Sequence, residues 1–189
     1  GGSISISSDG SVVAIGATGN DGGGSETGHV RVFKNVDDNW VQVGSDIDGQ
    51  QLYDDGGGYH QSGSSVNLSD DGNILVVGAN GWRDYDGYIH GEVRIYENNS
   101  GTWQQIGSTI DDIGDDCKTG KRTSISGDGT VLAVSSWSSG LVRIYERSGS
   151  SWNKTKEFSG SSGFGFSVSL SEDGSVLGIG SLYTDNEKG

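Results

Sequence analysis

The sequence predicts an all-β fold in which one four-stranded antiparallel unit is repeated, and three observations support this prediction. A Ser-x-Asp-Gly block recurs, with its aspartates at positions 9, 71, 128 and 173. Each of the first three blocks is followed by a Val-Arg segment and then by a tryptophan. No segment has helical periodicity. Strand-built repeats of this length are typical of stacked β-units, so we expect a β-propeller-like array of about three and a half blades.

The first strand of each unit is expected where small polar residues alternate with aliphatic ones, the period of a half-buried strand. These segments are residues 3–7, 65–69, 123–126 and 167–171. The Asp-Gly pair after each segment predicts a tight hairpin turn, because these residues reach positive φ at little cost. The aliphatic runs that follow do not alternate, so we expect second strands with both faces buried at 12–16, 74–78, 131–134 and 176–180.

The third strand of each complete unit carries one arginine between aliphatic neighbours: Arg31, Arg94 or Arg143. We interpret these arginines as structural, since the stem can pack while the head reaches solvent or a carboxylate. The fourth strand is predicted as a polar edge strand whose first tryptophan packs in the core or at the blade edge: Trp40, Trp103 or Trp152. The pattern thus predicts three units of four strands and a final pair.

The predicted blades belong to one repeat array that covers residues 1–189. Their approximate bounds are 1–48, 63–111, 120–158 and, for a partial fourth blade, 163–189. Because the chain starts and stops inside a repeat, we expect it to be part of a longer protein.

The charge balance argues against two classes of partner. The chain has 12 Lys and Arg against 26 Asp and Glu, a formal net charge of −14. Nucleic acids and anionic membranes bind clustered cations, so we expect neither as a partner. No apolar run approaches the roughly 20 residues of a membrane-spanning helix, so no membrane insertion is expected. The single Cys117 cannot form an internal disulfide, and its state is left open.

Two short elements resemble the FG-GAP repeat family, the blade type of the integrin α-subunit propeller and of many secreted microbial and algal surface proteins. The FG element is best kept at Phe164-Gly165, and the GAP element is approximated by Gly16-Ala17-Thr18 and Gly78-Ala79-Asn80. The resemblance implies propeller blades. Calcium-binding blades of that family carry an extended Asp-rich loop between their first two strands. Here that connection is a tight turn, which cannot supply the roughly six to eight oxygens that Ca²⁺ takes.

Loop carboxylates elsewhere are the remaining candidates for a cation. The best of them lie in the acidic run that begins at Asp111, where Asp111, Asp112, Asp115 and Asp116 could bind Ca²⁺. This run lacks the ordered ligand spacing of a calcium loop, so solvated loop carboxylates are the alternative, and no cofactor is required. The three histidines, His29, His60 and His90, form no zinc-binding pattern and are expected at the surface.

Aromatic residues in the long connections between second and third strands are the candidate ligand-binding residues. Trp82, Tyr85, Tyr88 and Trp137 could form a platform for a sugar or a partner protein, because aromatic rings bury a large area at little entropy cost. The alternative is that they pack over the rim of the array.

Three Asn-x-Ser/Thr triplets are candidate glycosylation sites. Asn98 and Asn153 lie on the two sides of the predicted turn between third and fourth strands, and are the better candidates. Asn67 lies inside a predicted first strand.

No nucleophile elbow or phosphate-binding loop is present in the sequence. The leading hypothesis is therefore a non-catalytic extracellular or cell-surface binding or adhesion module, whose ligand is a protein or a glycan. One alternative is a structural subunit of an extracellular filament or matrix, in which the open ends of the array join further copies or segments of the same protein. A third hypothesis is a propeller enzyme acting on polysaccharide, although the repeated block lacks the spacing and tryptophan of an Asp-box.

Overall fold

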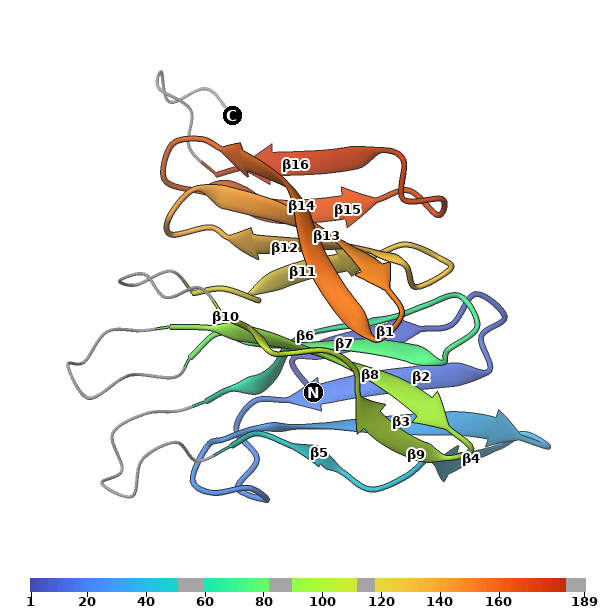
Figure 1. The fold of residues 1–189 in the computed structure, drawn as a ribbon. Coiled ribbons are helices and arrows are strands. Elements are labelled where there is room, and N and C mark those ends of the chain that lie inside the picture. The colour runs from blue at the N-terminus through green and yellow to red at the C-terminus, as the bar shows by residue number, and fades with distance from the viewer. Residues whose placement is uncertain (51–59, 82–89, 112–117, 183–189) are drawn as a thin grey trace.

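The computed structural model describes residues 1–50, 60–81, 90–111 and 118–182, which form four antiparallel sheets (Figure 1). The first sheet contains β1 (Ser3–Ile6), β2 (Val12–Ala17), β3 (His29–Val36), β4 (Asn39–Gln42) and β5 (Ile47–Asp48). The second contains β6 (Ser62–Leu68), β7 (Ile74–Ala79), β8 (Glu92–Asn99), β9 (Thr102–Gln105) and β10 (Ile110–Asp111). The third contains β11 (Arg122–Ile125), β12 (Val131–Ser136), β13 (Leu141–Ser148) and β14 (Ser151–Ser159), and the fourth β15 (Phe164–Leu170) and β16 (Leu177–Ser181).

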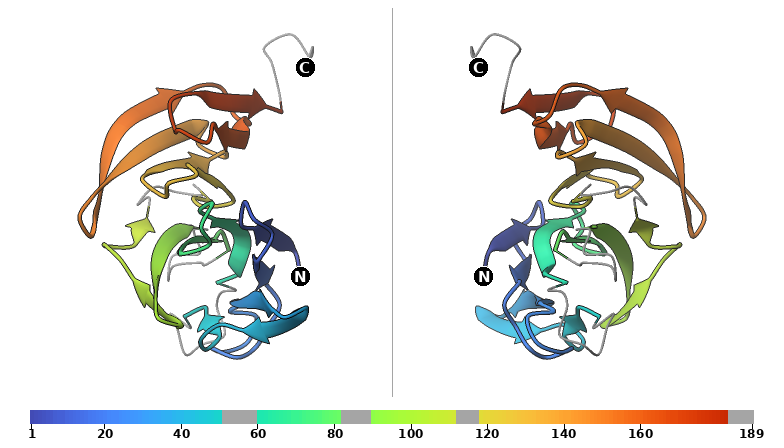
Figure 2. Two further views of the ribbon diagram at one scale, coloured as in Figure 1. Left: turned by 90° about the vertical axis from the view of Figure 1, so that its right-hand side faces the viewer. Right: turned by 90° about the vertical axis from the view of Figure 1, so that its left-hand side faces the viewer.

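The four sheets follow one another along an arc (Figure 2). The first strand of each sheet contacts the first strand of the next, so β1, β6, β11 and β15 lie side by side. The fourth strands β4, β9 and β14 form the opposite edge of their sheets and are largely exposed. This arrangement confirms the predicted all-β array, and we call the sheets blades 1 to 3 and half-blade 4. No helix in the described ranges is long and apolar enough to cross a membrane.

The Ser-x-Asp-Gly block closes the hairpin between the first two strands of each unit. In blade 1 the Ser7 hydroxyl donates to Asp9 Oδ1 (2.7 Å), and the Ser11 N–H donates to the same oxygen (2.9 Å). Gly10 has a φ of 71°. The hydrogen bonds from Ser11 and Ser7 lower the pKa of Asp9 to about 2. The repeated aspartate therefore has a structural role as the acceptor that orders the turn.

Backbone hydrogen bonds join the same turns from blade to blade. The Ser8 N–H donates to the Asp70 carbonyl (2.9 Å), the Asp70 N–H to the Gly127 carbonyl (2.8 Å), and the Gly127 N–H to the Glu172 carbonyl (2.7 Å). Each of these residues is the variable position of its Ser-x-Asp-Gly block, so the repeat specifies both the hairpin and its connection to the next blade.

Serine hydroxyls make a second connection between blades. Ser65 Oγ donates to the Gly120 carbonyl of the next unit at 2.8 Å. In blade 3, Arg122 occupies the position of this serine, and Ser135 on the paired strand β12 donates to the Gly165 carbonyl instead. In both arrangements a serine hydroxyl donates to a glycine carbonyl between two blades. An unpaired carbonyl in this packed position would cost free energy.

The second strands differ in burial, which corrects the expectation that all of them are buried on both faces. Every residue of β7 is buried, because blade 2 packs between blades 1 and 3. In β2 buried and half-buried residues alternate, and no residue of β16 is fully buried. Blade 1 and half-blade 4 each have one neighbour within the described residues, so one face of each sheet stays open.

The burial of the three repeated tryptophans also depends on whether a neighbouring blade covers them. Trp103 and Trp152 pack against the core clusters that join blade 2 to blade 1 and blade 3 to blade 2. Trp40 in β4 is 49% exposed, and Ile4 and Ile6 in β1, at the opposite edge of the same sheet, are 70% and 58% exposed. The prediction of a packed tryptophan is therefore wrong for Trp40, since no preceding blade covers it in the part of the chain that the structure describes.

The described residues form sixteen strands, where the repeat pattern predicts fourteen, and the difference lies at the outer edge of blades 1 and 2. The additional strands β5 and β10 arise because a glycine interrupts the fourth strand of blades 1 and 2. Gly44 and Gly107 have φ values of 75° and 73°, outside the range of a strand. After the bend, β5 and β10 return to pair with β3 and β8. Blade 3 has no glycine there, and β14 continues without interruption.

Candidate functional site

The ends of the strands define two faces of the array (Figure 1). The hairpin face carries the Asp-Gly turns between first and second strands. The loop face carries the connections from second to third strands and from each blade to the next. Asp111, Trp137 and the start of β3 at His29 all lie at the loop face, so the candidate residues of the sequence concentrate there.

The hairpin face has a groove of about 860 Å³ whose lining is strongly acidic: Asp70, Asp71, Gly127, Asp128, Ser171, Glu172 and Asp173. Its central carboxylates already accept hydrogen bonds within their own turns. The Ser171 hydroxyl and the Ser175 N–H, for example, lower the pKa of Asp173 to about 2. The groove is therefore a row of structural turns, and we do not assign it a ligand.

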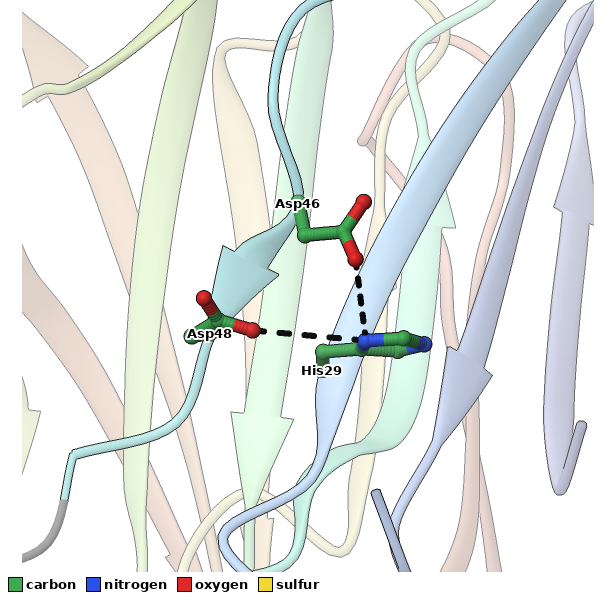
Figure 3. A group of neighbouring side chains, drawn as sticks. All are labelled: His29, Asp46 and Asp48. Atoms are coloured by element: carbon green, nitrogen blue, oxygen red, sulfur yellow. Dashed lines mark ion pairs between the residues drawn. The ribbon is translucent and has the colours of Figure 1, made fainter. Parts of the chain in front are cut away.

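The loop face of blade 1 brings one histidine and two aspartates together (Figure 3). His29 begins β3 and lies opposite Asp48 in the antiparallel register with β5. His29 Nδ1 is 3.3 Å from Asp46 Oδ2 and 4.0 Å from Asp48 Oδ1. His29 is 5% exposed, and its Nδ1 has no hydrogen-bond partner although both carboxylates are near. The site is thus a buried nitrogen that faces two oxygens.

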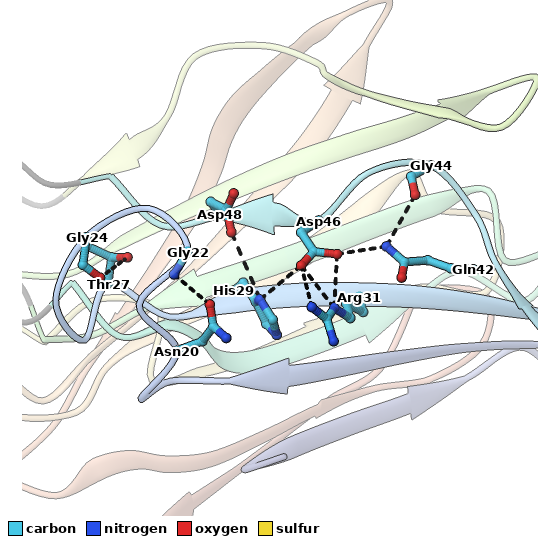
Figure 4. A network of polar contacts seen from close by, with 10 residues as sticks. All are labelled: Asn20, Gly22, Gly24, Thr27, His29, Arg31, Gln42, Gly44, Asp46 and Asp48. Atoms are coloured by element: carbon cyan, nitrogen blue, oxygen red, sulfur yellow. Dashed lines mark hydrogen bonds and ion pairs between the residues drawn. The ribbon is translucent and has the colours of Figure 1, made fainter.

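Hydrogen bonds hold the Asp46 carboxylate in this position (Figure 4). Arg31 Nη2 donates to Asp46 Oδ2 at 2.7 Å, and Arg31 Nε lies 3.0 Å from both carboxylate oxygens. Gln42 Nε2 donates to Oδ1 at 2.8 Å. The Arg31 hydrogen bond is the main cause that lowers the pKa of Asp46 to about 2, and burial opposes this shift. Asp46 is therefore ionised at neutral pH.

Blade 2 has a buried ionic cluster at the equivalent position, where Glu92 replaces His29 and Arg94 replaces Arg31. Arg94 Nη2 contacts Glu92 Oε1, and His60 Nε2 lies 3.2 Å from the same oxygen. Burial alone would raise the pKa of Glu92, but the hydrogen bond from His60 and the charge of Arg94 lower it. The cluster thus brings a carboxylate, an arginine and a histidine into mutual contact inside the array, since Arg94 Nη2 also lies 3.1 Å from His60 Nε2.

The prediction that the histidines lie at the surface is wrong. His29, His60 and His90 are 5%, 1% and 6% exposed. They lie at the base of the loop face, where β3 and β8 begin and where the chain enters β6. Sequence spacing missed this because the contacts join residues of different strands.

Of the predicted calcium ligands, the structure describes Asp111 alone. It ends β10 opposite Glu92, and its side chain is exposed. Asp112, Asp115, Asp116 and Cys117 lie outside the described residues.

Of the four aromatic residues predicted to bind a ligand, the structure describes Trp137, which follows β12 and is half-buried. Its ring meets Phe166 of half-blade 4 edge-on, with centroids 6.1 Å apart. The Nζ atoms of Lys118 and Lys121 lie 5.6 and 5.7 Å from the Trp137 centroid. The Arg122 guanidinium carbon lies 5.7 Å from the Phe166 centroid. The other predicted aromatics, Trp82, Tyr85 and Tyr88, lie outside the described residues.

The candidate glycosylation sites lie on the outer hairpins. Asn153 is exposed in β14, whereas Asn98 is half-buried, and its Oδ1 accepts a hydrogen bond from the Gly101 N–H (2.8 Å). Asn67 donates from Nδ2 to the carbonyl and hydroxyl of Thr123 in the next blade, so its amide is part of the packing between blades.

Comparison with known proteins identifies the fold. No protein-family profile matches the sequence, so the FG-GAP resemblance stays a prediction. No curated protein matches it either. Solved structures do match: the Cps50 (Swd1) β-propeller domain of Myceliophteria thermophila has a TM-score of 0.60 and 14% identity over 96% of this chain and 48% of that chain. The chain therefore has the fold of a partial β-propeller.

Two further structures show how widely this fold is distributed. Hydrazine synthase of Kuenenia stuttgartiensis has a TM-score of 0.58 and 16% identity, over 96% of this chain and 58% of that chain. A proposed 6-phosphogluconolactonase of Bacteroides fragilis has a TM-score of 0.55 and 20% identity, over 84% of this chain and 39% of that chain. The chain thus spans about half the length of the structures that it matches, and the likeness concerns the fold alone.

Proposed function

We propose that this protein is a non-catalytic binding module of an extracellular or cell-surface protein, and that it binds an acidic glycan at Trp137. The observation that carries the proposal is the cluster of aromatic rings and cations around this residue. Three of the 12 Lys and Arg of a chain with net charge −14 surround two aromatic rings there: Lys118, Lys121 and Arg122. The FG-GAP-like elements of the sequence support the extracellular location.

The cations of this cluster repel one another. Burial, followed by the charges of Arg122 and Lys118, lowers the pKa of Lys121. Within the described ranges none of the three forms an ion pair with a carboxylate. An anionic ligand would relieve this repulsion, and the rings of Trp137 and Phe166 would pack against the apolar face of a sugar.

The proposal predicts that changing Trp137→Ala weakens binding of acidic polysaccharide at least tenfold, because the ring supplies the contact area between the cations. Binding of dextran sulfate, polygalacturonate and uncharged dextran would be measured by isothermal titration calorimetry. Trp40→Ala is the matched control, since Trp40 is a half-exposed tryptophan on blade 1. This variant should bind the acidic polysaccharides as strongly as the unchanged protein does. Equal binding by Trp137→Ala, or no binding of either acidic polymer by the unchanged protein, contradicts the proposal.

The open faces favour a second candidate function, a structural subunit of an extracellular filament or matrix. Ile4 and Ile6 are exposed at one end of the array, and Val176, at the other end, is 64% exposed. Exposed strands with apolar faces associate readily with further strands. This candidate predicts that the mass measured by light scattering rises with protein concentration and that Ile4→Lys with Ile6→Lys prevents the rise. A monomer at all concentrations rules it out.

A further inference from the structure

We propose that His29, Asp46 and Asp48 form a binding site for a divalent transition-metal ion of the zinc type, on the loop face of blade 1. The site is separate from the aromatic cluster at Trp137 and does not depend on the glycan proposal. Its three ligand atoms, one nitrogen and two carboxylate oxygens, lie within 4.8 Å of one another.

The buried imidazole nitrogen points to a ligand. His29 Nδ1 is enclosed by the protein and makes no hydrogen bond, and its contacts with the two carboxylates are ion pairs only when the ring is protonated (Figure 3). A buried polar atom without a partner costs free energy, and native structures retain few of them. A metal ion between the nitrogen and the two carboxylates would supply the missing partner.

The distances favour zinc-type ions over calcium. In a tetrahedral site with bonds of about 2.0 to 2.2 Å, neighbouring ligand atoms are about 3.3 Å apart. The separation of His29 Nδ1 and Asp46 Oδ2 is 3.3 Å. Asp48 Oδ1 is 4.0 Å from the nitrogen, and its side chain is 41% exposed, so a bound ion would draw this oxygen closer. An imidazole ligand suits zinc, cobalt and nickel, whereas calcium takes oxygen ligands.

Neighbouring residues shape the site around these ligands (Figure 4). Arg31 orients Asp46 through its paired hydrogen bonds, as second ligand layers do in metal sites. A Cβ atom on Gly22 would lie 2.8 Å from Asp48 Oδ1 and 2.9 Å from Asn20 Oδ1. Glycine therefore leaves open the space between these two oxygens. An ion held by these three protein ligands would keep its fourth coordination position for water or for a group of another ligand.

The repeat provides an internal comparison. Blade 2 keeps the second aspartate as Asp111 but has Glu92 and Thr109 in place of His29 and Asp46. In blade 3, Leu141 is paired with Ser159 at the equivalent register. Among the described blades the three ligands occur together in blade 1, so Asp111→Asn is a matched control for Asp48→Asn.

The test is a titration of the full chain with Co²⁺ and with Zn²⁺. Calorimetry measures the binding of both ions, and visible absorption reports bound Co²⁺. A Cys117→Ser background excludes the thiol as a ligand. We expect one ion per chain, at least tenfold weaker binding for Asp48→Asn, and unchanged binding for Asp111→Asn. Gly22→Ala keeps every ligand and should also weaken binding, because its methyl group fills the space beside Asp48.

Three results would overturn the inference. They are no Co²⁺ or Zn²⁺ binding by the unchanged chain, equal binding by Asp48→Asn, and a loss in Asp111→Asn as large as in Asp48→Asn. Circular dichroism of each variant shows whether the fold is kept. Polysaccharide binding by Asp48→Asn should match that of the unchanged protein, so the metal inference and the glycan proposal can fail separately.

Discussion

Replacing Gly78 by alanine is expected to lower the free energy of unfolding by about 3 kcal/mol, the upper end of the range for overpacked cores. A Cβ atom at this position would overlap the Gly120 carbonyl oxygen of the next unit. That carbonyl also accepts the Ser65 hydroxyl, so it cannot move away without loss of a hydrogen bond between blades. Urea denaturation followed by tryptophan fluorescence measures the effect.

Gly178 provides the control for this change. It is also a glycine within a second strand, but a Cβ atom there would have its nearest contact at 3.7 Å, from the Ser169 carbonyl oxygen. Gly178→Ala should therefore leave stability unchanged or raise it by about 0.5 kcal/mol, since glycine is unfavourable inside a strand. Equal losses for the two variants would show that the close approach of blades 2 and 3 does not limit the residue at position 78.

The second large effect is expected for Arg94→Ala, which should lower the free energy of unfolding by about 3 to 5 kcal/mol. Arg94 is 6% exposed and contacts the buried carboxylate of Glu92. Its removal leaves that charge inside the array with His60 as the remaining partner, and an uncompensated buried charge is strongly destabilising. Urea denaturation at pH 7 in the presence of EDTA measures the loss without a contribution from bound metal.

Arg31→Ala is the matched variant, because Arg31 occupies the same repeat position and also pairs with a carboxylate. Its side chain is 46% exposed on the open face of blade 1, and the pair with Asp46 is accessible to water. An exposed pair contributes about 1 kcal/mol or less, so this variant should lose no more than that. A loss for Arg94→Ala as small as that for Arg31→Ala would contradict the assigned burial of the blade 2 cluster.

Much of the blade could be predicted from sequence because its signals are local. The alternation in residues 65–69 and the turn at Asp71-Gly72 each involve neighbouring residues, and they correspond to β6 and the hairpin that joins it to β7. The two additional strands were missed for a local reason as well. Gly44 and Gly107 interrupt the fourth strand, and a glycine in a polar segment does not reveal the direction in which the chain turns.

The candidate metal site could not be predicted in this way, because its ligands come from different strands. A conventional zinc pattern places histidines or cysteines a few residues apart, and no other histidine or cysteine lies near His29 in the sequence. The bend at Gly44 returns the chain so that Asp48 lies opposite His29. This pairing of the third strand with the chain after the bend is a feature of the structure, and no local pattern around His29 or Asp48 predicts it.

The sequence alone determined the repeated unit, its turns and the all-β class, since these depend on the conformations of adjacent residues. The tertiary structure decided which copies of the repeat are buried and which residues meet. Leu75 is fully buried, whereas Ile4 on blade 1 is exposed, because one blade has neighbours on both sides and the other does not. The meeting of His29 with Asp46 and Asp48 depends likewise on strand register, which brings together residues that the sequence separates.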